Sequence, residues 1–330
     1  MKRDDVKSLK FFILAGGYGK RAQPLSLIKP KPVFPLDGTP LLQIMLKQLQ
    51  EKGLREGFIN LHHLPEALRQ CAETMPERPL IQFLYEEELT GSRILKGALP
   101  AMAEDDVLLV VNGDIFLEIP VEEMLRQVVD NNDTDGILLV RRNKEMEARY
   151  KAVLTGGKPQ RGSITGGNIF TGRKIHDHSD SESISESLMY TGVSLFKKKV
   201  IQAIADINFF DSLERHKYRI KVLSYDGIWL DIGDPQSYVA TNFAYKSYVK
   251  ANSGDSNSVS ENVIISSDSM VEHSIIWENT EIKNESVIKN CIVTGNISLD
   301  HVRCQDQIIH KCPTTEFKLH PLTARPGAPL

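Results

Sequence analysis

Residues 11–41 read FFILAGGYGKRAQPLSLIKPKPVFPLDGTPL, an apolar run followed by a glycine-rich and then a proline-rich segment. The apolar run Phe11–Leu14 has the length of a short strand, and Gly16-Gly17 follows it at once. Glycine tolerates positive φ and lets bare backbone N–H groups come close to an anion. Because Pro24 is incompatible with a helix that continues from these glycines, we expect an extended loop here.

Basic side chains follow the glycines. Arg21 carries a planar fork of donors that suits phosphate oxygens. Lys29 and Lys31 belong to a Lys-Pro-Lys-Pro run, in which the prolines fix the backbone and lower the entropic cost of holding an ammonium group in place. The pattern predicts a polyphosphate cradle made by Arg21 and Lys31, whereas Lys20 and Lys29 also fit the description of solvated loop charges.

The same glycines also fit a weaker motif. The spacing Gly17-x-Gly19-x-x-Ala22 after a strand matches the dinucleotide-binding fingerprint of oxidoreductases, with Asp37 as a candidate ribose ligand. Pro24 falls where the phosphate-facing helix of that motif should begin, and the fingerprint leaves the Lys-Pro-Lys-Pro run unexplained. The phosphate cradle is therefore the better interpretation.

The whole pattern GGxGxR…P-L-S…KPKP…P-L-D-G-x-P-L resembles the signature of the nucleotide-sugar pyrophosphorylases, which are sugar-1-phosphate nucleotidylyltransferases. The resemblance covers about residues 11–250. It implies an enzyme that joins a nucleoside triphosphate to a sugar 1-phosphate, with Mg²⁺ as cofactor and pyrophosphate as the second product. It also implies catalytic roles for Arg21 and Lys31, and a nucleotide contact along Leu14, Ala15, Gly16 and Gly17.

Two aspartates at strand ends are candidate metal ligands. Asp114 follows the apolar strand Val107–Val111, and Asp231 lies just before the helix expected from Pro235. Ligands of open α/β sheets bind beyond the carboxyl ends of strands, and carboxylate oxygens suit a hard cation. The resemblance assigns both residues to Mg²⁺, whereas we expect the nearby Asp234 to cap the helix.

The choice of nucleotide is predicted from residues 86–91. Glu86 and Gly91 lie in a stretch that resembles the base-binding segment of the family. A carboxylate there could accept from the N1–H and amino group of guanine, which favours GTP. Arg93 departs from the small residues usual in the family, so uridylyl or thymidylyl transfer is an alternative, as is a regulatory homologue without turnover.

The sugar site is carried by weaker matches. The family has a Glu-Lys-Pro motif whose lysine contacts the sugar phosphate, and the nearest match here is Gly157-Lys158-Pro159, which lacks the glutamate and makes Lys158 the candidate for that role. Gly192 matches a glycine that lies against the sugar in the family. The segment after residue 252 resembles the C-terminal β-helix of longer family members such as mannose-1-phosphate guanylyltransferases, while Asn60–His63 looks like shorter members that act on N-acetylmuramate or heptose 1-phosphate. We expect His62 and His63 to be structural, because adjacent side chains on a strand point oppositely.

Strands and helices alternate along the first 250 residues, which predicts an α/β fold with a mostly parallel, Rossmann-like, doubly wound sheet. We expect short antiparallel strands and loops over the site between residues 141 and 187. Helices are expected at Thr39–Gly53, Pro65–Met75, Pro120–Asp130, Lys198–Ile207 and Pro235–Lys250, the first capped by Thr39.

The C-terminal segment has a different texture. Aliphatic residues recur every six positions, at Ile264, Met270, Ile276, Ile282 and Ile288. This period predicts a short left-handed parallel β-helix of fewer than two coils. We expect a catalytic domain at 1–252, the β-helix at 253–312 and a flexible tail at 313–330. If the chain forms a homo-oligomer, we expect contact through the β-helix.

Composition narrows the class of protein. The chain has 330 residues and a formal net charge of −3, which gives no electrostatic case for a nucleic-acid partner. Its four cysteines show no metal-binding spacing and are typical of thiols in a reducing compartment. The N-terminal residues match neither a signal peptide nor a membrane span, so we expect a cytoplasmic enzyme without a membrane partner.

Overall fold

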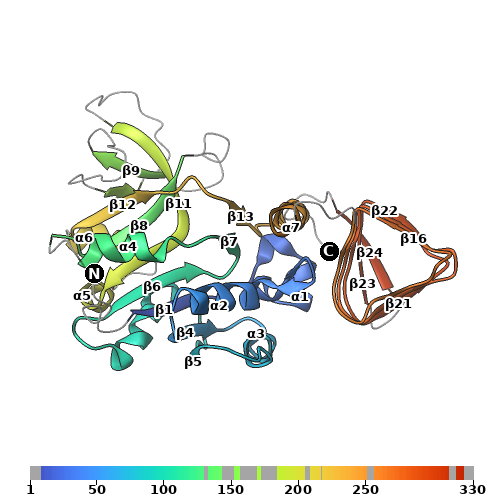
Figure 1. Ribbon diagram of the computed structural model, residues 1–330, viewed down its shortest axis with the longest axis horizontal. Helices are drawn as coiled ribbons and strands as arrows, with labels where there is room; N and C mark the ends of the chain where they lie inside the picture. Colours follow the sequence, from blue (N-terminus) through green and yellow to red (C-terminus); the bar gives the residue numbers. More distant parts are fainter. Residues whose placement is uncertain are drawn as a thin grey trace.

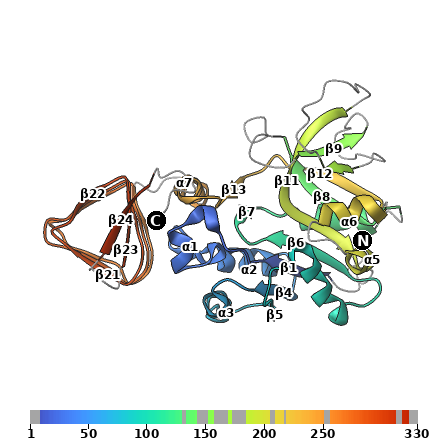
Figure 2. The same cartoon turned by 180° about the vertical axis from the view of Figure 1, so that it is seen from behind.

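The computed structural model describes residues 9–129, 133–142, 152–156, 169–171, 184–204, 209–216, 218–250, 256–311 and 317–322. It has an α/β part followed by a triangular stack of short strands (Figure 1). Helices α1 and α7 lie between the two parts in both views (Figures 1 and 2). The segment with long apolar strands therefore forms the α/β part, and the segment with the six-residue pattern forms the triangular stack (Figure 1).

The α/β part is built on one nine-stranded sheet. The order along its main path is β10-β9-β11-β6-β1-β4-β5, with β8 between β11 and β12. The strands are β1 (Leu9–Leu14), β4 (Glu56–Leu61), β5 (Leu80–Tyr85), β6 (Val107–Asn112), β8 (Gly136–Arg141), β9 (Ala152–Gly156), β10 (Ile169–Thr171), β11 (Ile184–Lys197) and β12 (Ile220–Ser224). Strands β5, β4, β1 and β6 run parallel, as do β8 and β12, which confirms the expected parallel core.

The other half of the sheet is mixed, with β8 and β12 parallel and the other pairs antiparallel. Strand β11 pairs antiparallel with β6, β8 and β9, and β10 pairs antiparallel with β9. Antiparallel strands were expected between residues 141 and 187, and β9 and β10 lie in that segment. The long β11 begins in that segment and continues to Lys197. Its 14 residues join the two halves of the sheet.

Helices cover both faces of the sheet. The helices are α1 (Leu25–Ile28), α2 (Leu41–Glu51), α3 (Pro65–Glu73), α4 (Val121–Val129), α5 (Lys198–Ala203), α6 (Phe209–His216) and α7 (Pro235–Val249), with 3₁₀ turns η2 (Lys20–Ala22), η3 (Lys31–Val33) and η4 (Gly91–Ala101). Alternate residues of β1 enter different cores. Phe11 and Ile13 pack with α2, α3 and α4, whereas Phe12 packs with η4, α5 and α6. The doubly wound architecture is confirmed.

One of the two predicted helix caps is present in the structure and the other is not. Asp234 accepts from the backbone N–H of Ser237 at 2.8 Å, and the Ser237 hydroxyl accepts from the Asp234 N–H, so a capping box opens α7 as predicted. Thr39 was expected to cap α2, which was wrong. Thr39 and Pro40 form the short strand β3 (Thr39–Pro40) against β2 (Pro35–Leu36), and α2 begins at Leu41 without a side-chain cap.

Two further strands lie at the carboxyl end of β6. Strand β7 (Ile115–Leu117) pairs antiparallel with β13 (Trp229–Asp231), and the register places Asp231 opposite Ile115. The Ile232 N–H also donates to the carbonyl oxygen of Asp114 at 2.9 Å. Residues more than a hundred positions apart are thereby fixed side by side.

The C-terminal part is a parallel β-helix, as predicted, and it is longer than expected. Its strands form three faces, β14-β17-β20-β23, β15-β18-β21 and β16-β19-β22. The strands are β14 (Ser258–Val259), β15 (Ile264–Ile265), β16 (Met270–Glu272), β17 (Ile275–Ile276), β18 (Thr280–Lys283), β19 (Val287–Lys289), β20 (Ile292–Val293), β21 (Ile297–Asp300), β22 (Arg303–Gln305) and β23 (Gln307–Lys311). Three complete coils are present, so the expectation of fewer than two was wrong.

The six-residue phase is correct only in the middle of the β-helix. Ile276, Ile282 and Ile288 are fully buried, but Ile264 and Met270 are 61% and 46% exposed. Residues paired in the first coils, such as Asn262 and Asn279, are 17 apart, and Ile292 and Ile308 of the last coil are 16 apart, fewer than the 18 of three six-residue repeats. At least one side of each triangle is therefore shorter, and Ile265 and Val271 take the places opposite Ile282 and Ile288.

The segment expected as a tail contains a strand. Strand β24 (Phe317–Pro321) pairs antiparallel with β23 over five residues, from Gln307 opposite Pro321 to Lys311 opposite Phe317. Leu322 is buried in the same core cluster as β1 and α2. This segment was missed because its sequence lacks the repeat of the preceding coils.

Candidate active site

The glycine loop after β1 is held by a side chain of the neighbouring strand. Asn60 Oδ1 on β4 accepts from the backbone N–H of Ala15 at 2.7 Å and from that of Gly16 at 3.3 Å. A Cβ on Gly16 would lie 2.7 Å from Asn60 Nδ2, so this position requires glycine. Gly17 is exposed and a Cβ there would meet nothing within 4 Å. The loop therefore has one anchored side and one open side.

Arg21 lies on the open side of this loop. The preceding Gly19 adopts φ 62°, in the left-handed region that favours glycine, and the turn η2 follows it. Arg21 is exposed and forms no ion pair with any residue that the structure describes. Its guanidinium group is thus available to an anionic ligand, as its predicted role requires.

Lys31 and Asp114 form an ion pair. The Lys31 Nζ is 3.1 Å from Asp114 Oδ2, and the two side chains are 10% and 34% exposed. Gly113 lets the residues after β6 lie close to the end of β1. Its N–H donates to the Leu14 carbonyl oxygen at 2.9 Å, and a Cβ there would lie 2.8 Å from the same oxygen. The glycine loop, the lysine run and the end of β6 therefore converge.

Asp231 comes to the same place through backbone pairing. It ends β13 opposite Ile115, the residue that follows Asp114. The Thr241 hydroxyl of α7 donates to the Asp231 carbonyl oxygen at 2.9 Å and fixes the end of the strand. The two aspartates predicted as metal ligands are therefore neighbours in the fold.

Glu86 is more constrained than the sequence predicts. Its Oε1 accepts from the Thr90 N–H at 3.0 Å and from the Thr90 hydroxyl at 2.6 Å, and its Oε2 accepts from Asn60 Nδ2 at 2.6 Å. Gly91 follows with φ 61° and begins η4, and the exposed Arg93 donates from Nε to the Thr90 carbonyl oxygen at 3.4 Å. Glu86 thus links the glycine loop to residues 90–93.

Of the two residues predicted to bind the sugar phosphate, the structure describes only Gly192. Gly192 has φ 91°, and a Cβ there would lie 2.8 Å from Ile115 Cδ1 and 2.9 Å from Asn112 Nδ2. It therefore lies against the strand end that carries Asp114. Lys158 lies outside the described residues.

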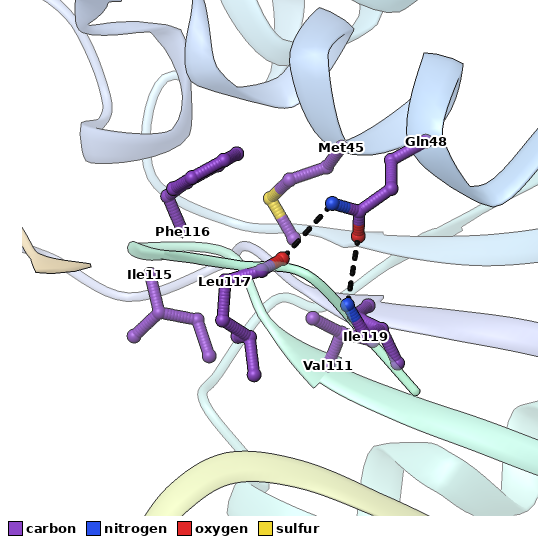
Figure 3. A pocket seen from close by; sticks show the side chains of 7 residues that line it. All are labelled: Met45, Gln48, Val111, Ile115, Phe116, Leu117 and Ile119. Atoms are coloured by element: carbon purple, nitrogen blue, oxygen red, sulfur yellow. Dashed lines mark hydrogen bonds between the residues drawn. The ribbon is translucent and has the colours of Figure 1, made fainter. Parts of the chain in front are cut away.

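A small apolar pocket lies behind the site, between α2 and β7. Figure 3 shows the Gln48 side chain bridging the Leu117 carbonyl oxygen and the Ile119 N–H, at 2.9 and 3.4 Å. The lining residues are Met45, Gln48, Val111, Ile115, Phe116, Leu117 and Ile119. None of them is a predicted site residue, so this pocket belongs to the packing of α2 on β7.

Comparison with known proteins identifies the family of this chain. Residues 10–247 match the family model described as Nucleotidyl transferase. The chain belongs to the nucleotidyl transferase family. A putative mannose-1-phosphate guanyltransferase of Sulfolobus acidocaldarius is 26% identical over 288 residues, which cover 85% of this chain and 74% of the relative. The bifunctional protein GlmU of Methanocaldococcus jannaschii is 25% identical, covering 88% of this chain and 74% of the relative.

Solved structures of other proteins have a fold similar to that of this nucleotidyl transferase. A UDP-glucose pyrophosphorylase from Acinetobacter baumanii matches with a TM-score of 0.61 at 15% identity, covering 74% of this chain and 95% of that one. HddC from Yersinia pseudotuberculosis matches with a TM-score of 0.55 at 20% identity, covering 72% and 99%. The recognition from sequence is confirmed, and this nucleotidyl transferase is a sugar-1-phosphate nucleotidyltransferase.

Two features of the nucleotidyl transferase site were missed from sequence. Asn60 anchors the glycine loop, and the only local signal was a polar residue inside the apolar strand Gly57–Leu61. Lys29 forms an ion pair with Glu278 of the β-helix and lies over the Trp277 ring, 5.1 Å from its centroid. Lys29 is therefore not a solvated loop charge, and its partner is 249 residues away.

His62 and His63 each contact a backbone carbonyl oxygen. His62 Nδ1 is 2.9 Å from the Glu86 carbonyl oxygen and His63 Nε2 is 2.7 Å from the Ser26 carbonyl oxygen. The polar partners differ, but both rings also pack against Tyr18, with ring centroids 4.9 and 5.7 Å apart. Burial raises the pKa of the Cys71 thiol to about 12 and that of Cys291 to about 11.

Among the described residues, no cluster of three His, Cys, Asp or Glu could hold a metal ion, and no helix is long and apolar enough to cross a membrane.

Replacing Asn60 with leucine should weaken triphosphate binding. The Ala15 N–H, in a residue only 2% exposed, loses its acceptor, which costs about 1–3 kcal/mol of folding free energy. We expect the KM for the triphosphate to rise about tenfold, measured in steady-state kinetics beside a thermal melt.

The control exchanges donor and acceptor. Asn60→Asp alone places a carboxylate against Glu86, whereas Asn60→Asp combined with Glu86→Gln restores one donor and one acceptor, and should recover most of the affinity. An Asn60→Leu enzyme with unchanged KM and melting temperature would contradict the anchoring role.

Proposed function

We propose that this protein transfers a nucleotidyl group from GTP to a mannose-type or heptose-type sugar 1-phosphate, with Mg²⁺ as cofactor. One observation carries the proposal. The Lys31 ammonium lies 3.1 Å from Asp114 at the mouth of the glycine loop, with Asp231 on the paired strand. A cation and two carboxylates beside a phosphate loop are the groups that phosphoryl-type transfer needs.

The chain's own residues position and neutralise phosphates. An oxygen of the sugar 1-phosphate attacks the α-phosphorus, a new P–O bond forms, and the bond from the α-phosphorus to the bridging oxygen breaks as pyrophosphate leaves. Arg21, exposed at the loop, binds the outer phosphates and stabilises the leaving group. Lys31 faces the α-phosphate and the attacking phosphate, where negative charge is concentrated.

The two aspartates fit Mg²⁺ by the chemistry of their donors. Mg²⁺ is usually bound through one or two carboxylates together with water and substrate phosphates, and Asp114 and Asp231 supply two carboxylates at one edge. When bound, the ion neutralises charge on the reacting phosphates. Before it binds, the Lys31 ammonium balances the Asp114 carboxylate.

GTP is proposed partly from relatives. The proteins of Sulfolobus acidocaldarius and Xenopus tropicalis carry the names putative mannose-1-phosphate guanyltransferase and mannose-1-phosphate guanylyltransferase catalytic subunit beta. Glu86 supports guanine less than its sequence suggests, because both of its oxygens already accept hydrogen bonds. Uridylyl or thymidylyl transfer is therefore the second candidate. A homo-oligomer through the β-helix stays a prediction.

A panel of triphosphates tests the proposal. GTP, UTP, dTTP, CTP and ATP are each added with Mg²⁺, and the melting temperature is measured, since a ligand that binds the native state raises it. We expect the largest rise with GTP, and pyrophosphate release when mannose 1-phosphate or a heptose 1-phosphate is added. A larger rise with UTP favours the second candidate, binding without release indicates a regulatory homologue, and no rise with any triphosphate overturns the proposal.

A further inference from the structure

The β-helix packs directly on the loop that carries Lys31. Trp277, at the corner after β17, is fully buried, and its ring lies 5.4 Å from that of Phe34. Its Nε1–H donates to the Tyr238 hydroxyl at 3.1 Å, and that hydroxyl donates to the Pro35 carbonyl oxygen at 2.7 Å. A tryptophan of the second part is thus a core residue of the first.

The neighbouring residue makes the polar half of this contact. Glu278 pairs with Lys29, and their side chains are only 21% and 20% exposed. The Lys29 ammonium also lies 5.1 Å from the centre of the Trp277 ring, at cation–π range. An ion pair at such low exposure is less screened than a surface pair, and removal of one partner leaves an uncompensated charge.

These contacts bracket Lys31 along the chain. Lys29 is separated from Lys31 by Pro30 alone, whose fixed φ transmits the position of one residue to the next. Downstream, the Phe34 N–H donates to the Lys31 carbonyl oxygen at 3.0 Å. The Lys31 backbone is therefore held on both sides by groups that contact Trp277 or Glu278.

We propose that Trp277 and Glu278 are positioning residues for Lys31, so that the β-helix completes the active site of the α/β part. The inference rests on the proposed role of Lys31 at the reacting phosphates. A displacement of about 1 Å in a catalytic group can cost up to about 10²-fold in rate, so the hold on this backbone matters for turnover.

The test compares two changes at the same interface. Glu278→Gln removes the partner of Lys29. The matched control, His273→Asn, removes the stack of His273 on Phe243 at 4.1 Å, a contact between the β-helix and α7 without any residue of the Lys-Pro-Lys-Pro run. Asparagine suits the positive φ of 45° at this position. Pyrophosphate release is measured with Mg²⁺, the preferred triphosphate and a sugar 1-phosphate, beside a thermal melt.

We expect Glu278→Gln to lower kcat about tenfold with little change in the KM for the triphosphate, because Lys31 acts on charge in the transition state. His273→Asn should leave kcat within about twofold. Adding Lys29→Met to Glu278→Gln should lower kcat no further, since both remove one interaction. Trp277→Phe keeps a ring over Lys29 and should retain more activity than Trp277→Leu.

The outcomes separate the inference from the proposed function. If Glu278→Gln and His273→Asn behave alike while the wild-type enzyme turns over, the positioning role is overturned and the function stands. If Glu278→Gln raises activity, Lys29 is itself a phosphate ligand that Glu278 restrains, and the positioning role is again overturned. If the wild-type protein releases no pyrophosphate with any triphosphate, both fail.

Discussion

Replacing Lys31 with methionine should lower kcat for nucleotidyl transfer by about 10²–10³-fold, equivalent to about 3–4 kcal/mol of lost transition-state stabilisation. The Lys31 side chain is only 10% exposed, so its replacement must fill nearly the same buried space. Methionine has a similar length and no charge. In the role proposed for Lys31, the reacting phosphates lose the ammonium group that pairs with Asp114. The measurement is the rate of pyrophosphate release at saturating substrates.

The control and the coupled variant sharpen this expectation. Lys20→Met removes a charge from the same loop, at an exposed residue whose ammonium lies 5.7 Å from the centre of the Tyr18 ring, and should change kcat less than about threefold. Asp114→Asn combined with Lys31→Met should cost less than the product of the single effects, because the two groups form one ion pair. Equal losses for Lys20→Met and Lys31→Met would show that net charge, not position, matters.

The signature loop could be predicted from sequence because its constraints are local. Pro24, the Lys-Pro-Lys-Pro run and the left-handed Gly19 each limit the backbone within a few residues, and no helix continues from the glycines, as expected. The loop is not extended throughout, because it contains the 3₁₀ turns η2 and η3 and the four-residue helix α1. The end of β6 was equally clear, since an apolar run followed by Asn112, Gly113 and Asp114 marks a strand end. Strand ends are where α/β folds bind ligands.

The partners of these residues were harder to predict because they are distant in sequence. Nothing near Lys29 indicates that Glu278 neutralises it, and nothing near Glu86 indicates that Asn60 and Thr90 occupy its oxygens. Such pairs depend on how two elements pack. The same holds for Asp231, whose place beside Asp114 follows from the register of β7 and β13.

The β-helix shows a different limit of sequence patterns. Five aliphatic residues at six-residue spacing indicated the architecture correctly, yet Ile264 and Met270 face outward. A period fitted over a few repeats cannot detect that the coils are 17 or 16 residues long instead of 18. Pairing of Ile265 with Ile282 and of Val271 with Ile288 fixes the phase instead.

Replacing Trp277 with alanine should destabilise the folded protein by about 3–5 kcal/mol. The side chain is fully buried, and its loss leaves a cavity between Phe34 and Tyr238 and removes the hydrogen bond to the Tyr238 hydroxyl. The hydrophobic core that contains β1 and α2 also contains Ile275, Trp277 and Ile292 of the β-helix. We therefore expect the wild-type protein to unfold in one transition and the variant to unfold in two.

The two tryptophans allow the parts to be followed separately. Trp229 lies on β13, with its Nε1–H bonded to the Thr191 carbonyl oxygen at 2.8 Å, so in Trp277→Ala its fluorescence reports on the α/β part alone. In Trp229→Phe, the remaining Trp277 reports on the contact between the parts. Urea unfolding followed by fluorescence and by circular dichroism should coincide in Trp229→Phe and diverge in Trp277→Ala.

A conservative change inside the β-helix provides the reference. Ile282→Val removes one methylene from a fully buried side chain that belongs to the core of the coils alone, and should cost about 0.5–1.5 kcal/mol while unfolding stays in one transition. If Trp277→Ala costs no more than Ile282→Val and still unfolds in one transition, the contact around Trp277 contributes little. The β-helix would then be an appendage, without the hold on Lys29 and Phe34 through which we expect it to fix Lys31.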